Sequence, residues 1–150
     1  MEKVRLTRVF RFEAGHALYG HDQKCQYLHG HSYKLSVTVI GIPIKDKSSP
    51  KLGMVIDFGD LKEVIYQQII EEFDHSMMLN VDSPHKKTAH YLEKEGHKIQ
   101  KLNYNPTCEL LVIDFANRIQ KSLPSGVELH SLTLWETKTS KAHWYKQDNL

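Results

Sequence analysis

The sequence has 150 residues, of which 40% are hydrophobic and 25% are charged, a length and composition that suit a single domain over residues 1–150. Its formal net charge is +2 and its Lys and Arg residues are scattered, which argues against a nucleic-acid-binding protein. It contains no apolar run of membrane-spanning length and no signal-peptide core near its N-terminus, so we expect a cytoplasmic protein without a membrane partner.

The first part of the chain has the composition of β-strands. Residues 4–12 favour a strand, although Val9 interrupts the alternation of apolar and polar side chains. Residues 33–42 alternate cleanly and predict a second strand. A loop rich in Pro and Ser follows, and the apolar run MVIDF at 54–58 predicts a third strand that returns antiparallel to the second.

A helix is predicted next. Asp60 can cap the free N–H groups of a helix start and Glu63 can reach back to it, and apolar residues then recur at helical spacing, so we predict a helix over 61–73. The polar segment 81–104 carries the weakest pattern, with one short helix that ends at Gly96.

A second clear helix begins near residue 105. Asn105 is a plausible cap, Pro106 suits the first helical position, and Pro124 ends the pattern. Its predicted buried stripe consists of Leu111, Phe115 and Ile119. Two further strands then form a hairpin around KTSK. Because strands and helices do not alternate, the order predicts an α+β fold with an antiparallel sheet.

Three histidines form the first candidate site. His29 and His31 are two apart at the start of the second strand, so their side chains point to the same side. His16 follows the first strand, and pairing of the two strands would bring it beside them. Three imidazoles with an open fourth position are typical of catalytic zinc. The alternative is a chance spacing in a chain with ten histidines.

A second candidate group contains Cys25, Asp74 and His75. Cys25 lies in a polar, lysine-flanked segment, where a nearby cation or metal would favour the reactive thiolate. Asp74 can fix the tautomer of the His75 imidazole if the chain folds back. Alternatively, Asp74 and His75 only end the preceding helix. The role of the other cysteine, Cys108, stays open.

Glu136 ends an otherwise apolar strand and shares the parity of Leu132 and Leu134. A carboxylate on a buried face needs a partner, which can be a cation or a ligand with N–H donors. The alternative is an edge position that faces solvent.

These pieces together resemble a known family, the 6-pyruvoyltetrahydropterin synthase / 6-carboxytetrahydropterin synthase family of the tunnelling fold (T-fold). The resemblance runs nearly end to end, and the order of the motifs is specific although each motif alone is weak. The motifs are F-x-A-x-H at 12–16, C-x-x-x-H-G-H-S-Y at 25–33, GMVIDFGDLK at 53–62, FDHSMMLN at 73–80, NPTCE at 105–109 and WET at 135–137.

The resemblance implies roles for these residues. It implies a Zn²⁺ ion on the three histidines, Cys25 as the catalytic thiol, and Asp74 and His75 as its proton-transfer partners. It implies that Glu136 anchors the amino-pyrimidine edge of a pterin substrate through two parallel hydrogen bonds. It places Thr107 and Glu109 near the pterin pocket.

Three residues separate Cys25 from His29, which is similar to the bacterial 6-carboxytetrahydropterin synthases of the queuosine pathway. The implied reaction converts 7,8-dihydroneopterin triphosphate to the 6-carboxy product and releases acetaldehyde and triphosphate. The alternatives are a pyruvoyl synthase without carbon–carbon cleavage and a non-catalytic, zinc-stabilised pterin-binding module. The resemblance departs at Leu110, where an asparagine is common, and in the long segment 81–104.

The resemblance also implies an architecture. It consists of an antiparallel sheet of about four strands with two helices on one face. Subunits join edge to edge into a trimeric β-barrel, and two trimers stack into a homo-hexamer.

Overall fold

Six strands form one mixed sheet in the computed structural model, which describes residues 1–150. The order across the sheet is β4-β3-β1-β2-β5-β6. The strands are β1 (Val4–His16), β2 (His29–Gly41), β3 (Ser76–Asn80), β4 (Ile99–Leu102), β5 (Val127–Trp135) and β6 (Lys141–Tyr145). The helices are η1 (Lys24–Gln26), α1 (Phe58–Ile65), the π-helical η2 (Tyr66–Ile70), α2 (Glu71–Phe73), α3 (His85–Lys94), α4 (Cys108–Gln120) and η3 (Lys146–Asn149).

The long hairpin of β1 and β2 is the centre of this sheet. The two strands are antiparallel, and their register runs from Val4 opposite Gly41 to His16 opposite His29. Both strands were predicted, but each extends further toward the histidines than the pattern indicated. The reason is that His16, His29 and His31 continue the ladder although they are polar.

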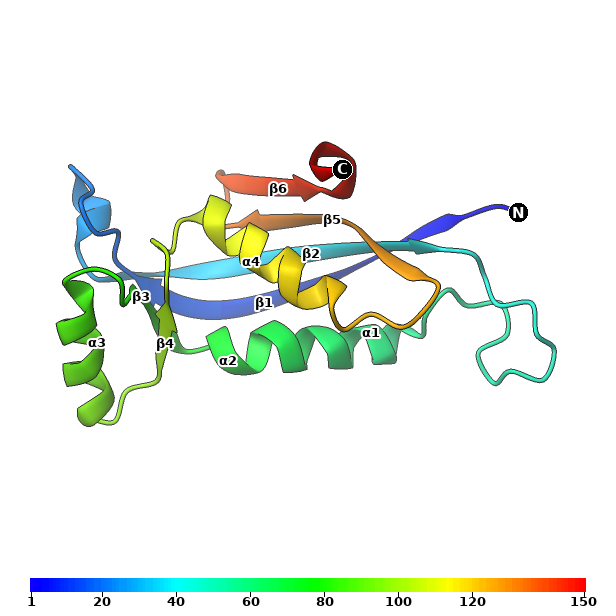
Figure 1. The fold of residues 1–150 in the computed structure, drawn as a ribbon, viewed down its shortest axis with the longest axis horizontal. Helices are drawn as coiled ribbons and strands as arrows, with labels where there is room; N and C mark the ends of the chain where they lie inside the picture. The colour runs from blue at the N-terminus through cyan, green and yellow to red at the C-terminus, as the bar shows by residue number, and fades with distance from the viewer.

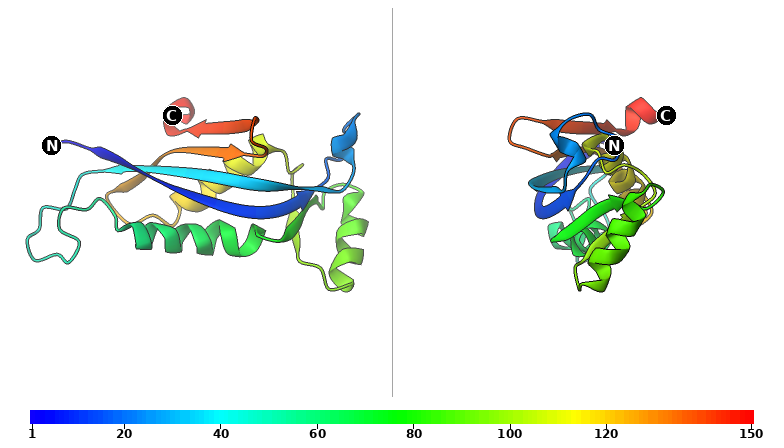
Figure 2. Two further views of the ribbon diagram at one scale, coloured as in Figure 1. Left: turned by 180° about the vertical axis from the view of Figure 1, so that it is seen from behind. Right: turned by 90° about the vertical axis from the view of Figure 1, so that its left-hand side faces the viewer.

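Two helical segments cover one face of the sheet. The ring centroid of Phe12 on β1 lies 6.5 Å from Phe73 at the end of α2 and 6.0 Å from Phe115 on α4. Figure 1 shows α4 in front of β2 and β5, and Figure 2 shows it behind these strands after the half-turn. A core of 26 buried residues fills the space between the sheet and these helices.

The first helical segment is continuous from α1 through η2 to α2. It begins three residues earlier than predicted, because Asp57, rather than Asp60, is the cap. The Asp57 Oδ1 atom accepts a hydrogen bond from Gly59 N at 2.7 Å, and Asp60 lies in the first turn. The fully buried residues recur every four positions, as the predicted apolar stripe requires; they are Leu61, Ile65, Ile69 and Phe73.

The second long helix, α4, also has a different cap from the predicted one. The Thr107 hydroxyl accepts a hydrogen bond from Leu110 N at 3.1 Å, so Thr107 is the cap and Asn105 lies outside the helix. Threonine competes well for this position because its oxygen reaches the free N–H groups of the first turn. The predicted stripe is confirmed, since its three members have no exposed area; they are Leu111, Phe115 and Ile119.

The predicted third strand at 54–58 is wrong. Val55 and Ile56 are buried, as an apolar run suggests, but they lie in a loop that leads into α1. Both long edges of β2 are already paired, with β1 on one side and β5 on the other. No free edge is left for a returning strand at this place.

The segment 81–104 contains the predicted short helix, α3, and Gly96 follows it with a φ of +92°. It also contributes β4, which the sequence did not predict. β4 pairs parallel to β3, and β3 pairs parallel to β1, so the sheet is mixed rather than antiparallel. The α+β class is confirmed, but with six strands instead of about four.

The other face of the sheet carries no helix over β1 and β2, whereas α3 packs on it at β3, where Ala89 contacts Leu79. Its β1 side chains alternate with the buried ones and are exposed, including Val9, Arg11 and Glu13. In the left view of Figure 2, β1 and β2 lie in front with nothing drawn over them. No helix of the structure combines the length and apolar character that crossing a bilayer would require.

Phe115 connects the two helical segments to the sheet, so we expect Phe115→Ala to lower the free energy of unfolding by about 3–5 kcal/mol through the cavity it leaves. Asn117→Ala changes an exposed position on the same helix and should alter it by less than about 0.5 kcal/mol. Urea unfolding followed by circular dichroism, at equal protein concentrations, measures both values. Equal effects of the two substitutions would contradict this packing.

Candidate metal and substrate site

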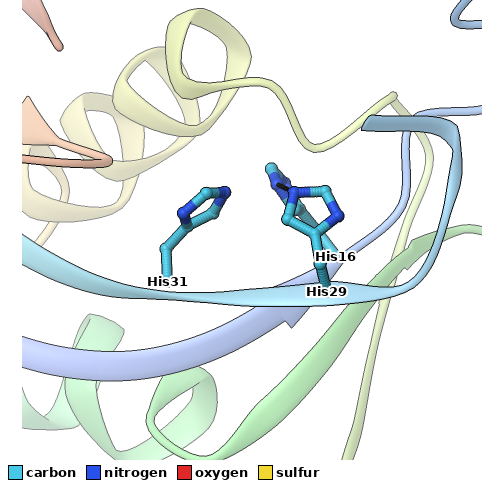
Figure 3. A group of neighbouring side chains, drawn as sticks. All are labelled: His16, His29 and His31. Carbon is cyan, nitrogen blue, oxygen red and sulfur yellow. Dashed lines mark hydrogen bonds between the residues drawn. The ribbon is translucent and has the colours of Figure 1, made fainter. Parts of the chain in front are cut away.

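Three imidazoles converge at the end of the β1–β2 hairpin. His16 and His29 are opposite each other in the register, and His31 lies opposite Ala14, so all three side chains project from the helix-covered face. Their ligand atoms all lie within 4.8 Å of one another, and His16 is 1% exposed (Figure 3). The strand pairing predicted from the sequence therefore does bring the three histidines together.

Backbone carbonyls determine the tautomers of two of these rings. The Nδ1–H of His16 donates to the Pro106 carbonyl at 2.8 Å, and the Nδ1–H of His29 donates to the Tyr27 carbonyl at 2.6 Å. Each ring then presents the lone pair of its Nε2 atom to the centre of the group. The two Nε2 atoms are 3.0 Å apart, a contact drawn dashed in Figure 3. Two lone pairs at this separation repel each other unless a proton or a metal cation lies between them.

Burial favours the neutral form, which metal binding needs, in His16 and His31. Burial, with the neighbouring His29 and His31, lowers the pKa of His16 to about 4, against the opposing effect of the Pro106 carbonyl. Burial also lowers the pKa of His31, and the nearby Glu136 carboxylate acts in the opposite direction. Neutral imidazole is the form that binds metals, so this group could hold a metal ion at pH 7.

Glu136 lies directly beside the histidines. Its Oε1 atom is 3.7 Å from His16 Nε2 and 3.9 Å from His31 Nε2, and its side chain is 26% exposed. These distances exceed those of a good hydrogen bond. The carboxylate oxygens can therefore still accept hydrogen bonds from a ligand. A ligand with N–H donors was one of the alternatives that the sequence left open for Glu136.

Cys108 is a structural residue next to this site. Its thiol donates to the Leu134 carbonyl at 3.2 Å. Burial, together with the Glu136 carboxylate, raises the pKa of the Cys108 thiol to about 12, so it remains protonated.

Cys25 lies in η1, in the loop that joins β1 to β2. It is half-buried, and its carbonyl accepts a hydrogen bond from Leu18 N at 2.8 Å, which closes the loop. Its thiol is not part of the three-histidine group. The structure thus places Cys25 on the loop that ends at His29.

Asp74 and His75 form a pair on the opposite face of the sheet. The chain folds back so that Asp74 Oδ1 lies 3.0 Å from His75 Nδ1. The His75 side chain is 76% exposed and borders an open pocket of about 310 Å³, which Glu13 and Ser32 also line. The side chain of Glu13 points away from the face that carries His16, because the two residues have opposite parity on β1. Asp74 and His75 are therefore not members of the three-histidine group, although His31, whose side chain projects from the other face, also lines this pocket.

Thr107 and Glu109 lie at the start of α4. The Thr107 hydroxyl is used as the helix cap, and Glu109 is exposed in the first turn. Their assignment to a pterin pocket stays a prediction.

The sequence did not identify two groups that orient the histidines, the backbone carbonyls of Tyr27 and Pro106. Backbone carbonyls have no sequence signature, because every residue has one. For Tyr27 alone, the short separation of two residues from His29 indicates that its carbonyl can reach the imidazole.

Comparison with known proteins points to one family. A family model described as 6-pyruvoyl tetrahydropterin synthase matches residues 5–147. The 6-carboxy-5,6,7,8-tetrahydropterin synthase of Rickettsia felis is 40% identical over 137 residues, which make up 89% of this chain and 94% of that protein. The protein of the same name from Haemophilus influenzae is 35% identical over 137 residues, or 91% of this chain and 94% of that protein.

The fold has solved relatives as well. The structure of Caenorhabditis elegans 6-pyruvoyl tetrahydropterin synthase superposes with a TM-score of 0.65 at 24% identity, and the match covers 97% of this chain and 96% of that chain. At this identity the likeness concerns the fold alone. It confirms the T-fold that the sequence predicted.

If the three histidines bind a metal ion, the purified protein should contain about one ion per chain, and His31→Ala should reduce this content to near zero because two imidazoles bind more weakly than three. The matched control is His90→Ala, which changes an exposed histidine on α3 and should keep the metal. Elemental analysis after dialysis measures both. Undiminished metal content in His31→Ala would refute the site.

Proposed function

The chain belongs to the 6-pyruvoyl tetrahydropterin synthase family, and we propose that residues 1–150 form one domain that acts as a 6-carboxytetrahydropterin synthase. The reaction converts 7,8-dihydroneopterin triphosphate to 6-carboxy-5,6,7,8-tetrahydropterin and releases acetaldehyde and triphosphate. It makes the protein a carbon–carbon lyase of the queuosine pathway. The observation that carries the proposal is the three-histidine group with Glu136 beside it, in a chain that is 40% identical to a protein of this name.

Zinc is the metal that we propose for His16, His29 and His31. Three neutral imidazoles with an open fourth position suit zinc, and tetrahedral Zn–N bonds of about 2.05 Å imply N···N distances of roughly 3.3 Å. The observed distance of 3.0 Å between the Nε2 atoms of His16 and His29 is close to this value. When bound, zinc supplies a Lewis acid that polarises a substrate oxygen and acidifies the adjacent carbon.

Glu136 is proposed to bind the pterin. The amino-pyrimidine edge offers two parallel N–H donors, and an ionised carboxylate accepts both in a bidentate arrangement. The Glu136 carboxylate lies within 4 Å of two histidines, so a pterin held by it would place its side chain next to the metal site. Thr107 and Glu109, at the start of α4, are proposed to line the same pocket.

Cys25 and the Asp74–His75 pair are proposed to move the protons. A hydrogen bond from His75 Nδ1–H to Asp74 Oδ1 leaves the Nε2 atom free to take a proton, and the carboxylate stabilises the resulting imidazolium. The thiol of Cys25 is the second proton carrier, mounted on the loop next to the metal ligands.

We propose that each active site is shared between subunits. The Asp74–His75 pair lies on the exposed face of the sheet, whereas the three histidines lie on the helix-covered face. Val9 on the exposed face is 47% exposed, and the edge strands β4 and β6 each leave one unpaired edge that another subunit could cover. Assembly into a homo-hexamer of two stacked trimers would bring the pair of one subunit to Cys25 of its neighbour. The cytoplasmic location expected from the sequence stays a prediction.

The identity of the product distinguishes a 6-carboxytetrahydropterin synthase from a 6-pyruvoyltetrahydropterin synthase. With dihydroneopterin triphosphate, we expect the wild-type protein to release acetaldehyde in equal amount to a carboxypterin, and His29→Ala to release neither because the metal site is lost. Mass spectrometry of the pterin and a coupled alcohol dehydrogenase assay for acetaldehyde measure this. Pyruvoyltetrahydropterin as the sole end product would make the protein a pyruvoyl synthase, and binding without turnover would make it a non-catalytic module.

The shared site predicts complementation between inactive variants. Cys25→Ala and His75→Ala should each lose about 10²–10⁴-fold in turnover as pure oligomers, because each removes a proton carrier. Refolding them together should create some interfaces that carry both wild-type residues, so activity should partly return. Light scattering should find a hexamer in all three samples. Mixed hexamers that stay inactive would show that the catalytic groups belong to one chain.

A further inference from the structure

His75 has an unusual backbone conformation. It is the one residue other than glycine with a positive φ, at +60°. A side chain with a Cβ atom rarely adopts this left-handed region, because the Cβ approaches the neighbouring backbone. Such conformations persist where the surrounding structure holds them, and they are concentrated at functional sites. The contacts that hold His75 therefore also determine where its imidazole points.

One peptide group sets this conformation, the group that joins Asp74 to His75. Its N–H, on His75, donates to the Glu13 carbonyl at 2.6 Å. Its C=O, on Asp74, accepts a hydrogen bond from the Lys98 ammonium at 2.8 Å. The peptide plane is thus held at both ends, by β1 on one side and by Lys98 on the other.

Lys98 has further contacts that fix it at this turn. Its ammonium also donates to the carbonyl of Glu71, at 2.6 Å, in the last helical turn before Asp74. Its own carbonyl accepts a hydrogen bond from Met77 N at 3.0 Å, just after the turn. Lys98 therefore contacts the chain before, within and after the Asp74–His75 pair, and it comes from the segment 81–104, where β4 begins.

Capping of the helix end is one reason for a lysine here, because an ammonium satisfies the free carbonyls and interacts well with the helix dipole. That role explains the bond to Glu71. It does not explain the bond to the carbonyl of Asp74, because this C-cap residue has an extended backbone and its carbonyl belongs to the turn that leads to His75.

We propose that Lys98 is a positioning residue for proton transfer, which holds the His75 imidazole in its productive direction through the Asp74–His75 peptide group. This inference rests on the proposed function for the role of His75. It gives the segment 81–104 a function that the sequence did not reveal, namely to bring this ammonium to the turn.

The test is Lys98→Met, which keeps the length of the side chain and removes its donors. We expect kcat to fall roughly 10- to 100-fold, since misplacement of a catalytic group by about 1 Å has an effect of this size. KM and metal content should stay unchanged, because neither the metal ligands nor Glu136 contact Lys98. Lys98→Arg, which keeps a cationic donor, should recover most of the lost kcat.

The matched control is Lys101→Met on β4, the strand that follows Lys98 directly. The Lys101 ammonium pairs with Glu93 at 3.0 Å on the surface, so its loss should leave kcat unchanged. The assay follows consumption of dihydroneopterin triphosphate, which both the carboxy and the pyruvoyl reactions share. A different product would therefore overturn the proposed function and leave the test of Lys98 intact.

A double-mutant cycle separates positioning from general loss of structure. In a His75→Ala background, Lys98→Met should lower the residual kcat no further, because the imidazole that it positions is absent. Wild-type kcat in Lys98→Met, or an equal loss with and without His75, would overturn the inference. If Lys98→Met does not assemble, Lys98→Gln, which is neutral and one bond too short to replace the ammonium, takes its place with the same expected and overturning results.

Discussion

The register between β1 and β2 is the constraint on which the site depends. Because His16 is opposite His29 and Ala14 is opposite His31, the ladder itself places three imidazoles on one face within ligand distance of each other. A slip of one residue would turn the β2 histidines to the other face. The same register aligns Phe12 with Tyr33, whose rings stack 4.9 Å apart in the core. Core packing and metal geometry therefore stabilise the same pairing.

The two faces of the sheet carry different groups of the proposed site. One face is covered by α1, η2, α2 and α4 and carries the core, and its end carries the three histidines and Glu136. The opposite face is exposed along β1 and β2 and carries the Asp74–His75 pair, whereas α3 covers it at β3. A sheet with an exposed area on one face and strands at its edges is suited to association with further copies. The proposed shared site is based on this division, because the Asp74–His75 pair and the side chains of the three histidines project from different faces of the sheet.

Backbone carbonyls organise both halves of the site. Those of Pro106 and Tyr27 select the tautomers of His16 and His29, and those of Asp74 and Glu71 hold Lys98. A left-handed residue such as His75 costs on the order of 1–3 kcal/mol, which the contacts around it must offset. The segment 81–104 contributes to this offset, since β4 pairs with β3 directly after the turn.

The sequence by itself determined the features that depend on neighbours along the chain. These include the two long strands, the apolar stripes of α1 and α4, the final hairpin, and the presence of His29 and His31 on the same side of a strand. The family resemblance added the T-fold and the reaction, because motifs in a specific order carry information that no single motif has.

Only the tertiary structure decided the features that depend on contacts between distant segments. Asp57 and Thr107 cap the helices in place of Asp60 and Asn105, because each has an extended backbone directly before the first helical residue and its side chain accepts from an N–H of the first turn. Residues 54–57 form a loop that leads into α1 because both edges of β2 are occupied, and β4 pairs with the edge of β3 that β1 leaves free. Lys98 reads as an ordinary surface lysine in the sequence. Its role arises from a contact with Asp74, 24 residues away, that no local pattern encodes.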